Sequence, residues 1–362
     1  MSTPIQKYSS ESSSSRRWIA IILIIVLVAA AAFAGLAFYM ANRGPEPAKT
    51  AGSFTGPVTP PPPEYRCPLD GSKVTSFAAT EKRPVLVQVD NAPAARPQSG
   101  LSQADIVYEA MAEGDVTRFS AIFACREVDA IGPVRSARLI NLELVPEYTA
   151  LLSNSGSSRG TSDALEAAAL PNINDPSYPQ AYWRVSDRIA PHDMMTSTSN
   201  IRNAAESVGI PSTYKVTPLI FKDDTPAPTV TSIGVPYSGI ADVSYRYDPG
   251  TNSWLRFIGG DAHIDSLNGA QISPKNVVIQ YVSISESDIE EDAGGNMGLI
   301  FGLQGTGRVQ VFRDGQMVEG TWERTGESSV TWYLDATGKP IPLNRGLTFV
   351  QLVPVDFQPA IS

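Results

Sequence analysis

The chain has 362 residues and a formal net charge of −9, with 28 basic residues, 37 acidic residues, two histidines and two cysteines. An acidic chain lacks the basic surface that nucleic acids require, so we exclude a nucleic-acid partner. Two histidines and two cysteines are too few for a conventional zinc site, and we predict no metal site and no cofactor.

The first element in chain order is an apolar segment, residues 18–40, which contains 23 residues without a charge. As a helix it would be about 34 Å long, enough to span a bilayer. Arg16 and Arg17 precede it, and basic residues favour the cytoplasmic side. We therefore predict a single-pass membrane protein with a cytoplasmic tail, residues 1–17, and an extracytoplasmic remainder. Signal-peptide cleavage after "AFAG" is the less favoured alternative.

A proline-rich stalk is predicted next, over residues 41–65, with seven prolines in residues 41–64. Its length in an extended conformation is at most roughly 70 Å. Removing Lys7, Arg16, Arg17 and Glu11 from the totals leaves 25 basic and 36 acidic residues, a net charge of −11. An anion attracted to the extracytoplasmic part must therefore meet a local group of cations.

Residues 66–215 alternate strands with helices, which predicts an α/β or α+β domain. Strands are predicted at residues 83–90, 104–112 and 117–124, and helices at residues 134–144, 161–170 and 199–209. Thr161 or Ser162 is the expected cap of the second helix. Gly209 suits the position after the last helix.

The first predicted helix has an unusual start. Pro133 suits the first helical position, and Arg135 and Arg138 would then lie in the first turn on one face. Cations are unfavourable there, because a helix N-terminus already carries about half a positive charge. The pair therefore calls for a binding partner of opposite charge.

Residues 216–239 are rich in proline and predict a crossing segment. Beyond them, residues 240–357 form a series of short strand-like runs separated by Gly, Asn and Asp turns. This pattern predicts a second, mainly-β domain.

Polar side chains are concentrated in the first domain. The candidate ligand-binding residues are Asp90, Asn91, Arg96, Glu109, Arg118, Arg135, Arg138 and His192. Helix N–H groups and two guanidinium groups together suit a phosphate or carboxylate. We predict that an Arg-rich cleft binds an anionic small molecule or a cell-wall-related ligand. In the competing interpretation, the arginines pair with Glu109 and Glu113 in a structural network.

Two other function classes stay open. An envelope hydrolase or transferase acting on a phosphoryl or glycosyl group would use Asp90 or Glu109 as base or nucleophile and His192 as acid. An Asp, Glu and Asn cluster could also hold a divalent metal through oxygen atoms. A scaffold for other envelope proteins would instead show an exposed apolar patch.

Cys67 and Cys125 both lie in the part predicted to be extracytoplasmic, where a disulfide persists. A bond between them would stabilise the fold by about 4 kcal/mol in the chain-entropy model. The alternative is two unpaired thiols.

Several long stretches resemble the YerB-like family, which comprises bacterial cell-surface proteins of uncharacterised function. In the first domain these are "RPVLVQVDNAPAARPQSGLSQADIVYEAMAEGDVTRFSAIF", "IGPVRSAR" and "APHDMMTS". In the second they are "NVVIQYV", "VFRDGQMVEGTW" and "DATGKPIPLNRGLTFVQLVP". The resemblance spans residues 66–355 and implies two domains on an N-terminal membrane attachment, often a lipid, which a transmembrane helix replaces here. Ala92, Asp115 and Asp193 depart from the residues common in the family.

Overall fold

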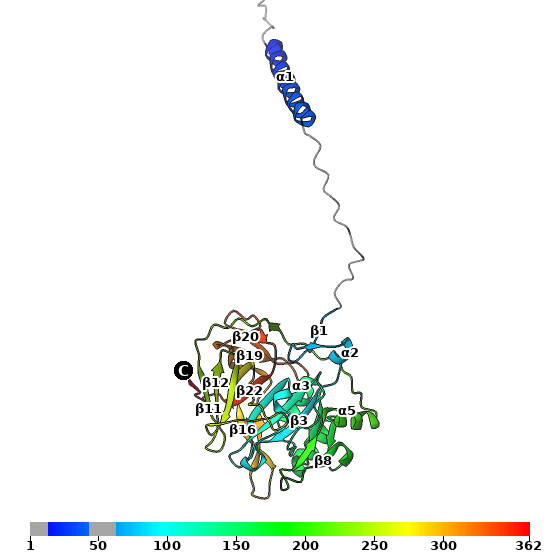
Figure 1. Cartoon of the computed structure of the whole chain (residues 1–362), viewed down its shortest axis with the longest axis vertical. Coiled ribbons are helices and arrows are strands. Elements are labelled where there is room, and N and C mark those ends of the chain that lie inside the picture. Colours follow the sequence, from blue (N-terminus) through cyan, green and yellow to red (C-terminus); the bar gives the residue numbers. More distant parts are fainter. Residues whose placement is uncertain (1–13, 43–62) are drawn as a thin grey trace, which may run out of the picture. The chain divides into compact units, whose positions relative to one another are not determined.

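The computed structural model describes residues 14–42 and 63–362. The first range holds helix α1, Ser14–Ala41, of which Ile21–Ala41 is long and apolar enough to cross a membrane. Residues 1–13 of the predicted tail and residues 43–62 of the predicted stalk lie outside the described residues. Residues 63–362 fold around one large sheet (Figure 1).

The large sheet has ten strands, and both halves of the chain contribute to it. In spatial order they are β20 (Trp332–Asp335), β19 (Gln316–Arg324), β18 (Gly305–Arg313), β15 (Asn276–Val282), β22 (Thr348–Pro354), β4 (Ile106–Met111), β5 (Thr117–Phe123), β3 (Val85–Asp90), β6 (Leu151–Asn154) and β7 (Asn172–Asn174). The halves meet where β22 pairs in parallel with β4, from Thr348 opposite Ile106 to Gln351 opposite Glu109. The predicted limits of two separate domains therefore stay a prediction, because one sheet runs through both.

A second sheet has five antiparallel strands: β14 (Asp261–Ala262), β13 (Ser253–Ile258), β12 (Asp242–Asp248), β11 (Ser232–Pro236) and β23 (Ala360–Ile361). Four two-stranded ladders complete the strands: β1 (Tyr65–Arg66) with β2 (Lys73–Val74), β8 (Tyr182–Arg184) with β9 (Met194–Thr196), β10 (Phe221–Lys222) with β21 (Leu343–Asn344), and β16 (Ile284–Glu290) with β17 (Met297–Phe301). A mixed α/β region thus precedes a mainly-β region, as the sequence predicts.

Short helices connect these strands. They are α2 (Phe77–Thr80), α3 (Asn141–Tyr148), α4 (Arg159–Ala167), α5 (Thr198–Ser207) and the 3₁₀ turns η1 (Pro93–Ala95), η2 (Leu101–Gln103) and η3 (Pro179–Ala181). The cap of α4 is Ser158, whose hydroxyl accepts the Thr161 N–H at 3.1 Å, so this helix starts before the predicted cap. Gly209 follows α5 at φ +80, the left-handed conformation expected of a stop.

The ten-stranded sheet is covered on both faces, because its strands alternate side chains between two cores. Val87 and Phe349 pack with Trp254 of the five-stranded sheet and with α5. Leu86 and Val350 project from the other face and pack with α3 and α4. Almost every central strand is therefore apolar on both sides.

The helix predicted over residues 134–144 is wrong in its first half. Residues 131–135 do not form a helix: residues 133–135 pair beside the end of β3, and α3 begins only at Asn141. The Asp90 N–H donates to Pro133 O, and the Arg135 N–H donates to Gln88 O. This pairing satisfies the backbone of β3 beyond Val87, where β6 no longer pairs with β3, and buries Val134, which a helix would not achieve.

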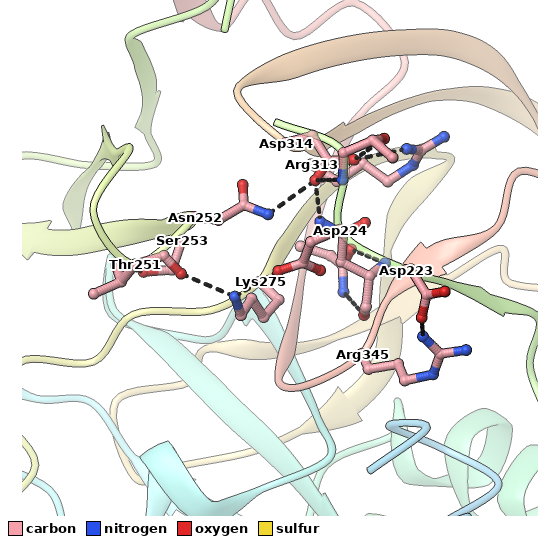
Figure 2. Close-up of polar contacts among 12 residues, drawn as sticks. Asp223, Asp224, Thr251, Asn252, Ser253, Lys275, Arg313, Asp314 and Arg345 are labelled. Atoms are coloured by element: carbon pink, nitrogen blue, oxygen red, sulfur yellow. Dashed lines mark hydrogen bonds and ion pairs between the residues drawn. The ribbon is translucent and has the colours of Figure 1, made fainter. Parts of the chain in front are cut away.

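A buried carboxylate fastens the crossing segment to the β region. Asp314, in the turn between β18 and β19, accepts amide hydrogen bonds from Asn252 and Asn344 at 2.9 and 2.6 Å (Figure 2). Its other oxygen pairs with Lys222, which lies in β10. Burial alone would raise the pKa of the Asp314 carboxyl, but these donors outweigh it and hold the pKa well below its usual value. The ionised form therefore stabilises the fold.

We expect Asp314→Asn to lower the free energy of unfolding by about 3 kcal/mol at pH 7, because buried donors lose a charged acceptor. Stability from a carboxyl with a lowered pKa is complete above the pKa of the unfolded chain and is lost as the pH falls toward the folded value. The gap between wild type and variant should therefore shrink from about pH 5 downward. Urea unfolding between pH 3 and 7 measures it, with exposed Asp356→Asn as the control. A gap that stays constant would contradict the assignment.

Candidate functional site

Strand alternation divides the predicted site residues into two groups. Asp90 of β3 and Arg118 of β5 project toward the core of α3 and α4, on the same face as Leu86 and Ile122. Glu109 of β4 projects from the opposite face, toward the five-stranded sheet. Predicted site residues that are close in the sequence therefore lie on opposite faces of the large sheet.

The group on the helix-covered face is an arginine cluster. Its members come from the ends of strands, from the extended segment before α3 and from the connection after β16. They are Asp90, Glu113, Arg118, Arg135, Arg138 and Glu291. Three guanidinium groups thus face three carboxylates.

Arg138 is the most firmly held of the three arginines. Its Nε donates to Glu113 Oε2 at 2.8 Å, and its Nη2 pairs with the other oxygen of the same carboxylate. Its Nη1 donates to the carbonyl of Ala137 at 2.8 Å and lies 3.7 Å from Glu291 Oε2. This two-pronged pairing matches the competing prediction for Glu113, but not for Glu109.

Asp90 occupies the other side of the arginine cluster. Its Oδ2 lies 2.7 Å from His192 Nδ1 and 3.2 Å from Arg135 Nε, and its Oδ1 accepts the Ala92 N–H at 3.1 Å. The His192 side chain is 22 % exposed, whereas Asp90 is buried. The carboxylate therefore orients a ring that solvent can still reach.

Arg118 lies farthest from a carboxylate among the three arginines. It is buried, and its Nη1 lies 3.7 Å from Glu113 Oε1, beyond hydrogen-bond distance. Within residues 63–362 neither its Nε nor its Nη1 has a hydrogen-bond acceptor. Burial lowers the pKa of Arg118 to about 10, so the group still carries its charge at neutral pH. A buried cation with unused donors is a costly feature, which an additional acceptor would relieve.

A small cavity opens beside these side chains. Arg118, Arg138 and Glu113 line it together with Leu299 and Phe301 of β17. Its volume is about 20 Å³, which is room for about one water molecule. The cavity therefore has room for one ligand atom, such as a single carboxylate oxygen, and not for a whole ligand.

The second group forms a buried ring of hydrogen bonds between the two sheets. Its members are Asn91, Gln98, Glu109, Thr117, Arg256 and His263. Arg256 of β13 donates to Glu109 Oε2 at 2.6 Å, and both side chains are fully buried. Arg96 lies at the edge of this ring, where its Nη2 donates to the carbonyls of Asn91 and Ile240 at 2.9 Å.

The state of His263 follows from its surroundings. Burial and the charge of Arg256 lower the pKa of His263, so the imidazole of His263 is neutral. Its Nδ1 accepts from Arg256, and its Nε2–H donates to Gln98 Oε1 at 2.6 Å. Gln98 then donates to Asn91 Oδ1 at 2.9 Å, and Asn91 donates to Thr117 at 2.7 Å. Asn91 and Glu109 both make hydrogen bonds within this buried ring. They therefore help to hold the ten-stranded and five-stranded sheets together.

The structure therefore brings Asp90, Arg118, Arg135, Arg138 and His192 together, and it places Asn91, Arg96 and Glu109 elsewhere. Sequence reasoning missed Glu291, which sits in an acidic run between exposed Glu290 and Asp292. No local signal separates it from these neighbours.

Cys67 and Cys125 are joined by a disulfide, with Cα atoms 5.8 Å apart. Cys67, Asp70 and Asp105 also lie close enough together to suggest a metal site. A disulfide sulfur is not a thiolate, however, and Asp70 is already paired with Arg126. This group fits a metal ion poorly.

Comparison with known proteins gives the family. The profile described as "Protein of unknown function (DUF3048) N-terminal domain" matches residues 69–211, and that of the DUF3048 C-terminal domain matches residues 233–350. The chain is 34 % identical over 297 residues to "Putative lipoprotein YerB" of Bacillus subtilis (strain 168), covering 80 % of this chain and 87 % of that protein. A crystal structure of YerB protein from Bacillus subtilis superposes with a TM-score of 0.73 at 31 % identity, covering 82 % of this chain and 99 % of the other.

The buried ring predicts a strong and asymmetric response to mutation. Glu109→Gln should cost about 3–5 kcal/mol in the free energy of unfolding, because Arg256 is then buried without a counter-charge. Adding Arg256→Met should cost much less than the sum of the single changes. Denaturant unfolding of the three variants gives the coupling.

The exposed pair Arg308 and Glu319 is the control. Glu319→Gln should cost less than about 1 kcal/mol. If Glu109→Gln costs no more than this control, the ring does not hold the sheets together.

Proposed function

Since the chain belongs to the YerB-like (DUF3048) family and carries an apolar N-terminal helix consistent with membrane attachment, we propose that it is an envelope protein that binds one anionic group at the arginine cluster. The observation that carries this proposal is Arg118, a buried guanidinium group with two donor nitrogens that lack an acceptor in the described part of the chain. A carboxylate or phosphoryl oxygen is the acceptor that such donors favour.

The dimensions of the site restrict the ligand. A cavity of about 20 Å³ accepts the end of a molecule only, and three carboxylates in the arginine cluster already balance the three guanidinium groups. Long polyanions are disfavoured because the chain is acidic overall. Terminal carboxylates or phosphates of cell-wall fragments, or of lipid-linked wall precursors, fit these limits.

His192 and Asp90 support a second candidate, an envelope hydrolase or transferase. Their 2.7 Å contact fixes the imidazole through Nδ1, which leaves Nε2 to exchange a proton. The binding experiment below separates this candidate from simple binding, since an enzyme would consume the added compound.

We also propose the membrane topology. Residues 18–40 cross the membrane once, with Arg16 and Arg17 on the cytoplasmic side and residues 63–362 outside. The folded part then meets wall material directly.

Trypsin treatment of intact protoplasts tests the topology. The stalk contains Arg43 and Lys49, so cleavage there should release the folded part without lysis. A tag placed before residue 1 should stay protected until the protoplasts are lysed. Release that requires lysis would contradict the proposed orientation.

A thermal-shift series on purified protein tests the anion site. We expect phosphate, citrate or soluble wall fragments to stabilise wild type, by about 2.7 kcal/mol at 100 times the dissociation constant. Arg118→Met should abolish this stabilisation because it removes the free donors. Arg159→Ala is the matched control, since that side chain is 95 % exposed.

Each result has a clear meaning. Stabilisation that survives in folded Arg118→Met would contradict the proposal, and so would the absence of any shift. Loss of the added compound over time, abolished by His192→Gln, would favour the enzyme.

A further inference from the structure

The hairpin of β16 and β17 continues from β15 and β18 of the large sheet, with only Ser283 between β15 and β16. Its two strands pair only with each other, whereas both large sheets are built from other strands. The hairpin packs against α4, and Leu299 and Phe301 of β17 line the cavity together with Arg118. The hairpin is therefore part of the wall of the proposed anion site.

The hairpin places one carboxylate inside the arginine cluster. Glu291 follows β16, and its side chain has no exposed surface, whereas Glu290 and Asp292 on either side are exposed. Its Oε1 accepts the Thr161 hydroxyl at 2.5 Å. Its Oε2 lies 3.7 Å from Arg138 Nη1 and has no hydrogen bond among the described residues.

Such an arrangement is poorly suited to a purely structural ion pair. Buried ion pairs are worth keeping only when their geometry satisfies both partners. Here Arg118 retains unused donors and Glu291 retains an unused acceptor oxygen, although both belong to the same cluster. The carboxylate is held near the guanidinium groups without forming their best contacts.

We propose that Glu291 is an internal competitor for the anion site, and that the hairpin of β16 and β17 is its lid. This inference rests on the proposed function. An external carboxylate or phosphate takes the unused donors of Arg118 and displaces the Glu291 carboxylate from its place beside Arg138, and the hairpin moves away from α4 as it does so. The arrangement with Glu291 inside the arginine cluster competes with anion binding, and its stability lowers the apparent affinity for the anion.

The contact between the hairpin and α4 provides a means of locking the lid. Gly160 of α4 lies against Ile289, and a Cβ atom built on Gly160 would stand 3.4 Å from Ile289 Cβ. Disulfides join residues whose Cβ atoms are roughly 3.5–4.5 Å apart. A cysteine at each position can therefore close the hairpin covalently.

The first test compares Glu291→Gln with Glu290→Gln in titrations of phosphate and citrate followed by calorimetry. Both changes remove one negative charge from the same hairpin, but only Glu291 enters the arginine cluster. We expect Glu291→Gln to lower the Kd by roughly tenfold, within the usual range of coupling between two ligands. Glu290→Gln should leave it unchanged.

The second test uses Gly160→Cys/Ile289→Cys. The oxidised variant should bind the same anions at least roughly tenfold more weakly than its reduced form. Wild type with and without reductant controls for the native disulfide. This comparison of Kd values tests the lid even if Glu291→Gln is unstable.

The outcomes distinguish failure of the lid from failure of the anion site itself. Anion binding by wild type with an unchanged or higher Kd in Glu291→Gln, or with equal Kd values in the locked and reduced forms, would overturn the competitor and lid while leaving the anion site in place. No binding by any variant would overturn the proposed function and this inference with it.

Discussion

Four residues of β4 pair in parallel with four residues of β22, and this short ladder joins the two halves of the chain. Its position in the middle of the ten-stranded sheet fixes which side chains meet. On one face, Glu109 comes opposite Arg256 of the five-stranded sheet. On the other face, Arg118 lines the same cavity as Leu299 and Phe301 of β17. A shift of one residue in this ladder would exchange the two faces of β4 and break the buried ring.

The alternation of side chains between the two faces of a strand also explains which elements can be predicted from the sequence. Apolar runs such as those of β3 and β15 predict their strands well, because buried strands are apolar on both sides. The segment around Pro133 misleads, since proline and alternating polar residues suit both a helix start and an extended edge. The deciding factor is β3, whose backbone groups beyond Val87 are not paired with β6 and bond to this segment in its extended form.

In the candidate site, the sequence predicts the arginines better than it predicts their partners. Arg118, Arg135 and Arg138 are visible in the sequence because charged residues interrupt apolar runs. Their partners are less visible. Glu291 lies 153 residues beyond Arg138, among acids that look alike, and only the packing of a distant hairpin selects it. Asn91 and Glu109 lie apart from the arginine cluster for a simpler reason, because successive residues on a strand project from opposite faces of the sheet.

The disulfide between Cys67 and Cys125 has a mechanical consequence. Cys67 lies four residues after Pro63, where the described folded part begins, and Cys125 follows β5 in the middle of the large sheet. Tension on the chain from its anchored side would therefore pass into the centre of the sheet through a covalent bond. The small ladder of β1 and β2 would bear little of this load, and the residues between the two cysteines could not be pulled out one after another. A chain held at its N-terminal side gains a force-bearing attachment point in this way.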